Sequence, residues 1–140
     1  MGLLYAVLIL LPALTFALEE LKPFNDTAMA FFLIADADMD GFIDKKENFN
    51  SFSEYDGDSD GVTTRQEYTD HVIEFSPTLL AVSLALFSLY DADDDGQLKK
   101  NDFDHFYSLM DGNGDGQLTQ WEYVQYWIDL FELMEQKMND

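Results

Sequence analysis

The sequence predicts an all-α domain in which short helices flank four acidic loops. Apolar residues recur at helical spacing between polar segments, and the carboxylates gather in four twelve-residue windows of one repeated pattern. The chain of 140 residues has no cysteine, so neither a disulfide framework nor a thiolate metal site is available. With 47% apolar residues, it has room for one domain with a hydrophobic core of its own.

The composition is strongly acidic. The formal net charge is −21, yet aromatic residues make up 15% of the chain, which argues against a disordered acidic tail. A folded chain of this charge needs counter-ions, which either bound metal or a cationic partner can supply. Nucleic acid would be repelled by the same charge, so we expect no nucleic-acid partner.

The N-terminal segment, residues 1–17, has no charged side chain and the composition of a secretory signal peptide. The run Leu3–Leu14 has the length of a signal-peptide apolar core, and Thr15–Ala17 offers a small-residue cleavage site. A transmembrane helix needs about 20 apolar residues, whereas this run is shorter and contains Pro12; a buried N-terminal helix is the third interpretation. We expect cleavage after Ala17, a mature domain over residues 18–140 without a membrane span, and a secreted, extracellular protein.

Seventeen of the 28 acidic residues lie in four windows, called loops 1 to 4 in chain order. Each window begins with Asp, has Gly at its sixth position and ends with Glu or Asp at its twelfth. The windows span residues 36–47, 56–67, 91–102 and 111–122.

This order of residues suits a hard cation such as calcium. Side-chain oxygens at positions 1, 3 and 5 can approach one side of the ion, and glycine at position 6 permits the sharp turn. Position 7 offers its backbone carbonyl, position 9 often acts through water, and glutamate at position 12 supplies two oxygens. Without an ion, so many carboxylates in one loop would repel one another. The candidate metal ligands are Asp36, Asp38, Asp40, Phe42, Asp44 and Glu47 in loop 1, Asp56, Asp58, Asp60, Val62, Thr64 and Glu67 in loop 2, Asp91, Asp93, Asp95, Gln97 and Asp102 in loop 3, and Asp111, Asn113, Asp115, Gln117 and Glu122 in loop 4.

These windows resemble the loops of the EF-hand, or calmodulin-like, superfamily, and the resemblance extends from Asn25 to about Met134. It implies a compact domain of four helix–loop–helix units and up to four bound calcium ions. The alternative is a set of acidic turns that contain glycine by chance, which four windows in register disfavour. An aliphatic residue at position 8, here Ile43, Leu98 and Leu118, can pair with a neighbouring loop as a short strand.

The spacing of the loops predicts which of them pair. Loops 1 and 2 start 20 residues apart, as do loops 3 and 4, whereas loops 2 and 3 start 35 residues apart. Only the longer interval has room for two helices and a turn; the eight residues between the other loops form about two helical turns. We therefore expect loops 2 and 3 to pair with each other, and loops 1 and 4 to pair at the opposite end.

The loops depart from the pattern in informative ways. Loop 3 ends in Asp102, one methylene shorter than glutamate, and has Lys99 at position 9. We expect it to be the weakest calcium site, or the one most tolerant of Mg²⁺, which takes six ligands at shorter distance. Loop 2 has Thr63 at position 8, and loop 4 has only three carboxylates.

The preferred functional interpretation is a secreted calcium binder that stays loaded, as a structural, storage or matrix protein. Besides calcium, a basic protein, a mineral or a matrix component is a candidate partner. An alternative is a calcium sensor whose apolar groove, lined by Met29, Met110, Met134, Met138, Trp127 and Phe131, takes up a partner helix. A calcium-dependent enzyme finds little support, because His71 and His105 lie apart from any nucleophile motif. The final helix is expected over Trp121–Met134. Its apolar stripe, Trp121, Val124, Trp127, Ile128 and Phe131, is expected to face the core.

Overall fold

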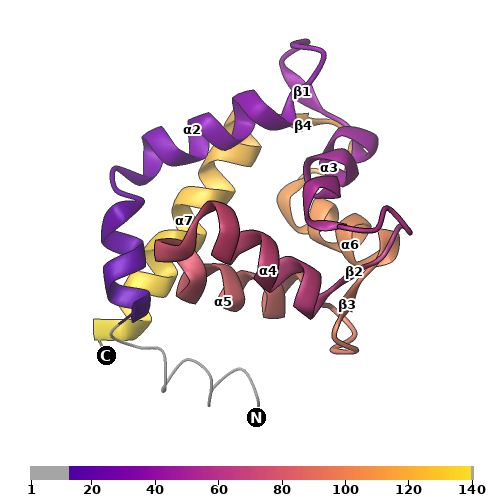
Figure 1. Ribbon diagram of the computed structural model, residues 1–140. Coiled ribbons are helices and arrows are strands. Elements are labelled where there is room, and N and C mark those ends of the chain that lie inside the picture. The colour runs from indigo at the N-terminus through magenta and orange to yellow at the C-terminus, as the bar shows by residue number, and fades with distance from the viewer. Residues whose placement is uncertain (1–12, 140) are drawn as a thin grey trace.

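The computed structural model describes residues 13–139, which form helices and two short antiparallel strand pairs (Figure 1). Residues 13–20 are helical. The further elements are α2 (Phe24–Ala35), β1 (Phe42–Ile43), α3 (Lys45–Ser51), η1 (Ser53–Tyr55), β2 (Thr63–Thr64), α4 (Arg65–Phe75), η2 (Pro77–Leu79), α5 (Leu80–Tyr90), β3 (Gln97–Leu98), α6 (Lys100–Met110), β4 (Leu118–Thr119) and α7 (Gln120–Asn139). The prediction of a mostly helical domain is confirmed.

The helices pack in pairs, and the strands join the loops. Helix α2 lies beside α7, α3 beside α6 and α4 beside α5 (Figure 1). Strand β1 pairs with β4, so that Ile43 faces Leu118, and β2 pairs with β3, so that Thr63 faces Leu98. Loop 1 therefore lies next to loop 4 and loop 2 next to loop 3. The 35-residue interval holds α4 and α5, while each 20-residue interval holds only α3 with η1, or α6.

One cluster of buried apolar side chains runs through the domain. Helix α5 contributes heavily to it, since none of residues 81–90 is exposed. The ring of Phe106 lies at the centre of an aromatic group, with centroids 4.8 Å from Tyr90, 5.6 Å from Tyr126 and 5.8 Å from Trp127. Edge-on aromatic contacts of this kind stabilise a core beyond the area that they bury.

The helical segment over residues 13–20 packs into the same core. Leu14, Ala17, Leu18 and Leu21 are all buried in it. The cleavage site expected after Ala17 therefore lies inside a helix of the full chain, and cleavage there would remove Leu14 and Ala17 from the core. The rest of the expected signal segment, residues 1–12, lies outside the described residues.

Two expectations about the final helix need correction. Helix α7 continues to Asn139 instead of ending near Met134. Trp121, expected at the core, is 73% exposed, whereas Trp127 and Phe131 are buried as expected. Trp121 is position 11 of loop 4 and lies in the first turn of α7, so helical spacing alone does not bring it into the core. No helix among residues 13–139 has the length and hydrophobicity needed to cross a membrane.

Candidate metal centres

The fold gathers the carboxylates of each loop into one cluster. In every loop, oxygens of the acidic residues at positions 1, 3, 5 and 12 lie within 4.8 Å of one another, except that Asn113 replaces the acid at position 3 of loop 4. The clusters are Asp36, Asp38, Asp40 and Glu47; Asp56, Asp58, Asp60 and Glu67; Asp91, Asp93, Asp95 and Asp102; and Asp111, Asp115 and Glu122.

The four loops share an unusual backbone at positions 4 and 6. The glycines at position 6 have left-handed φ angles, for example 87° at Gly41 and 78° at Gly116. A Cβ added at either glycine would meet no atom within 4 Å, so the requirement comes from the backbone angle and not from space. Position 4 is also left-handed, although non-glycine residues, Met39, Ser59 and Asp94, occupy it in three loops. Sequence reasoning missed position 4, because only loop 4 has glycine there.

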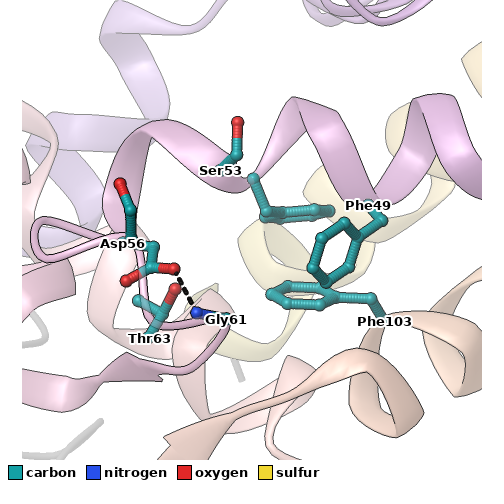
Figure 2. A pocket seen from close by; sticks show the side chains of 8 residues that line it. Phe49, Ser53, Asp56, Gly61, Thr63 and Phe103 are labelled. Carbon is teal, nitrogen blue, oxygen red and sulfur yellow. Dashed lines mark hydrogen bonds between the residues drawn. The ribbon is translucent and has the colours of Figure 1, made fainter.

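Backbone N–H groups fix the aspartates at the start of each loop. The Asp36 carboxylate accepts a hydrogen bond from the N–H of Gly41 at 3.0 Å. Figure 2 shows the equivalent bond in loop 2, from the N–H of Gly61 to the Asp56 carboxylate at 2.8 Å. At position 5, Asp40 accepts from the N–H of Phe42 at 2.9 Å. These bonds hold the side chains folded over their own loop, with the remaining oxygens available to an ion.

The acid at position 12 closes the loop from the first turn of the next helix. In loop 1, the two oxygens of Glu47 accept from the N–H groups of Asp44 (3.1 Å) and Asp38 (3.3 Å). Asp44 in turn accepts from the N–H of Glu47 at 2.8 Å, which completes a capping box. Thr64 with Glu67, and Thr119 with Glu122, repeat this arrangement. The position 9 side chains of loops 1 and 2, Asp44 and Thr64, thus act as helix caps and stand apart from the carboxylate clusters.

The other candidate ligands lie as follows. The position 7 residues Phe42 and Gln97 begin β1 and β3, and Val62 and Gln117 directly precede β2 and β4. The N–H groups of all four donate to the position 5 aspartate of their own loop. The side-chain oxygen of Asn113 accepts from the N–H of Asp115 at 3.2 Å, as Asp38 does from Asp40 in loop 1.

Loop 3 contains its own cation. The ammonium group of Lys99 lies 2.8 Å from a carboxylate oxygen of Asp95, and its hydrogen bond lowers the pKa of Asp95 to about 2. The shorter Asp102 is fully buried and accepts from the N–H groups of Lys99 (3.0 Å) and Ala92 (3.1 Å). An incoming metal ion would have to compete with this lysine for Asp95.

Loops 1 and 4 each contain a buried carboxylate oxygen to which no group donates a hydrogen bond. Asp36 is only 5% exposed and Asp111 only 7%, yet Oδ1 of each is buried and has no hydrogen-bond partner. Burial of an unpaired charged oxygen is costly. A hard cation would satisfy both oxygens, so the residues present fit a calcium ion.

Desolvation acts on further carboxylates of the loops. It raises the pKa of Asp38 to about 6, with the nearby charges of Asp40 and Glu47 adding to the rise. Desolvation also raises the pKa values of Asp58 and Asp91. Protons therefore compete with a cation for Asp38 in mildly acidic solution.

Comparison with known families agrees with this geometry. The EF hand family model matches residues 29–47, from the second half of α2 through loop 1. No curated protein and no solved structure matches the chain. The match and the acidic clusters together support an EF-hand family and calcium binding.

Proposed function

We propose that the chain binds up to four calcium ions, one in each loop, through the candidate ligands named above. The observation that carries this proposal is the pair of buried, unpartnered oxygens of Asp36 and Asp111, each within a cluster of carboxylates. The shared left-handed backbone at positions 4 and 6 supports extending the proposal to all four loops. Loop 3 is the weakest of the four for calcium, or the most tolerant of Mg²⁺.

We further propose that the protein is secreted and stays loaded with calcium, as a structural, storage or matrix protein. Extracellular modules of this kind bind in the range of about 10⁻⁴–10⁻³ M. Filling four sites would neutralise eight of the charges and change the net charge from −21 to −13. The loaded surface would therefore remain acidic and suited to a basic protein, a mineral or a matrix component.

Calcium titration of the metal-stripped protein tests the first proposal. We expect three or four sites, most with Kd of about 10⁻⁵–10⁻³ M, and a gain of folded structure as they fill. Calorimetry at physiological salt gives the number of sites, and circular dichroism follows the folding. No heat of binding at millimolar calcium would reject calcium binding, and cooperative sites of micromolar or tighter affinity would reject the constantly loaded, extracellular role.

Expression in secretory cells tests the second proposal. We expect the protein in the medium, with Leu18 as its first residue by N-terminal sequencing. Cleavage would then precede folding, because Ala17 and Leu18 are buried in the full chain. Retention in the cells with residues 1–17 still attached would instead favour the N-terminal segment as a permanent core helix.

A calcium sensor is the second candidate, favoured by a groove of about 440 Å³. Its lining includes Phe31, Phe75 and Trp127. A sensor would expose more apolar surface on binding calcium, and the fluorescence of an apolar dye during the titration measures this. An enzyme finds no such support: the ring of His71, for instance, packs against Tyr55 and Phe75 with centroids 4.6 Å away.

A further inference from the structure

One aromatic position recurs in all four repeats, but only one of its occupants has a hydroxyl group. Tyr107 lies in α6, four residues before Asp111, the first residue of loop 4. The residues four places before loops 1, 2 and 3 are Phe32, Phe52 and Phe87. All four rings are buried in the core cluster. The ring therefore belongs to the general packing of the repeat, whereas the hydroxyl group is particular to Tyr107.

The Tyr107 hydroxyl lies between two loops. It donates to the carbonyl oxygen of Ile43, position 8 of loop 1, at 2.7 Å, and lies 3.2 Å from the carbonyl oxygen of Gly116, position 6 of loop 4. Phe42 and Gln117, the position 7 residues whose carbonyls are proposed to bind the ions, are the chain neighbours of these two residues. One buried hydroxyl group therefore lies one peptide unit from a proposed ligand carbonyl in each loop.

We propose that Tyr107 is a positioning residue that couples the metal centres of loops 1 and 4. The position 7 carbonyl of each loop would hold the ion, and its adjoining peptide units would then be fixed. Because those units share the Tyr107 hydroxyl, an ion in one loop orders an anchor of the other loop. The second ion then meets a loop that is already partly ordered and binds more tightly. This inference rests on the proposed calcium binding.

A cycle of two substitutions measures the coupling. Glu47→Gln disables loop 1 but keeps the capping hydrogen bonds, which glutamine also makes. The calcium affinity of loop 4 is then read from the amide NMR signal of Gly116. With Tyr107 present, we expect Glu47→Gln to weaken loop 4 by about 5–10-fold; with Tyr107→Phe, we expect a loss of less than about twofold.

The matched control is Tyr68→Phe. The hydroxyl of Tyr68 donates to the carbonyl oxygen of Ser83 at 2.8 Å and joins α4 to α5, away from loops 1 and 4. This variant also loses one hydroxyl group bonded to a backbone carbonyl, but we expect it to keep the full 5–10-fold coupling. Loss of coupling in both variants would show a general loss of stability and overturn the inference.

A reciprocal measurement keeps the inference testable from the other side. Disabling loop 4 with Glu122→Gln must weaken loop 1, read at Gly41, by the same factor, because linkage between two sites is symmetrical. Tyr107→Phe is expected to fold, since phenylalanine occupies the equivalent position in the other three repeats. An unchanged coupling factor in Tyr107→Phe, or equal weakening of loops 2 and 3 read at Gly61 and Gly96, would overturn the inference while leaving calcium binding intact. Absence of calcium binding by the unmodified protein would overturn the proposed function itself.

Discussion

The two loop pairs share a backbone but offer a cation different surroundings. In the pair of loops 1 and 4, Asp36 and Asp111 are buried with an unpartnered oxygen each, and Tyr107 joins the loops. In the pair of loops 2 and 3, Asp56 is half-buried, and Lys99 already neutralises Asp95. The first pair therefore depends on an external cation more than the second does.

The packing beneath the strands also differs between the pairs, and it is tighter in the pair of loops 1 and 4. Ile43 and Leu118 face each other in the first pair, and both are fully buried. In the second pair Thr63 replaces the aliphatic residue, and a cavity of about 210 Å³ lies beside it, lined by Phe49 and Phe103 among others (Figure 2). The comparison teaches that the shared twelve-residue pattern sets the course of the backbone, while residues that differ between the loops, such as Thr63 and Lys99, set the surroundings that a cation would meet.

Removal of calcium is expected to have the largest effect and to separate the two pairs. In about 10 mM calcium, a site with Kd of about 10⁻⁴ M stabilises the fold by about 2.7 kcal/mol. Loops 1 and 4 together would lose about twice that on chelation. Amide hydrogen exchange of the chelated protein should show Gly41 and Gly116 losing protection before Gly96, because Lys99 still pairs with Asp95 in loop 3. Equal loss at all three glycines would contradict the contrast between the pairs.

The second-largest effect is expected from substitutions at position 12, which compare how strongly loops 1 and 3 depend on their closing acid. We expect Glu47→Gln to weaken loop 1 by about 100-fold, equivalent to about 2.7 kcal/mol, because the negative charge and one of the two ligand oxygens are lost. Asp102→Asn should weaken loop 3 by only about tenfold, since the shorter side chain offers the ion a single oxygen. Site-resolved NMR titrations measure both losses. A greater loss in loop 3 than in loop 1 would show that Asp102 is the stronger ligand.

Replacing Lys99, the cation within loop 3, should reduce the difference between the two loop pairs. Lys99→Thr frees Asp95 and places at position 9 the residue that caps the helices after loops 2 and 4. We expect about tenfold tighter calcium binding in loop 3, and about 1 kcal/mol of added stability from the cap of α6. Calcium titration followed at Gly96, and urea unfolding with calcium present, measure the two effects. The control, Lys100→Thr, removes a lysine that pairs with Asp104, which is not part of the carboxylate cluster of loop 3, and should leave the affinity unchanged.

The smallest effect is expected from replacing Thr63, the residue at position 8 of loop 2. Thr63→Val removes a buried hydroxyl group from β2 and should stabilise the loaded protein by about 0.5–1 kcal/mol, measured by urea unfolding. The reverse exchange at the other end, Ile43→Thr, should cost about 2 kcal/mol, because a well-packed apolar side chain gives way to a polar one. If Thr63→Val destabilises instead, its hydroxyl group has a structural role in β2.

The sequence was sufficient for the loops because their determinants are local. Glycine at position 6 and acids at positions 1 and 12 act within twelve residues, so the turn can be predicted from the pattern. The capping box formed by positions 9 and 12 is not expected from it, because the pattern assigns position 9 to the ion. The left-handed conformation at position 4 could not be predicted from the pattern. Met39 and Ser59 adopt it because the loop constrains them, and not because these residue types prefer it. The 20- and 35-residue intervals limit where helices fit, which makes the order of the strands predictable as well.

Contacts between distant segments could not be predicted. The hydroxyl of Tyr107 meets a carbonyl 64 residues away, and no pattern in the sequence distinguishes this tyrosine from the phenylalanines of the other repeats. The burial of Leu14 and Ala17 depends likewise on the core cluster that distant helices form after folding. Such contacts follow from the packing of whole helices, which periodicity alone does not determine.

The contrast between Trp121 and Trp127 has a practical consequence for spectroscopy. Trp121 directly precedes Glu122 of loop 4 and is 73% exposed, whereas Trp127 is 4% exposed in the core. The chain thus contains two tryptophan fluorophores, one red-emitting and open to a dissolved quencher, the other blue-emitting and shielded from it. The quenchable part of the emission reports on loop 4, and the shielded part reports on the core. Both can be followed in a single unlabelled sample.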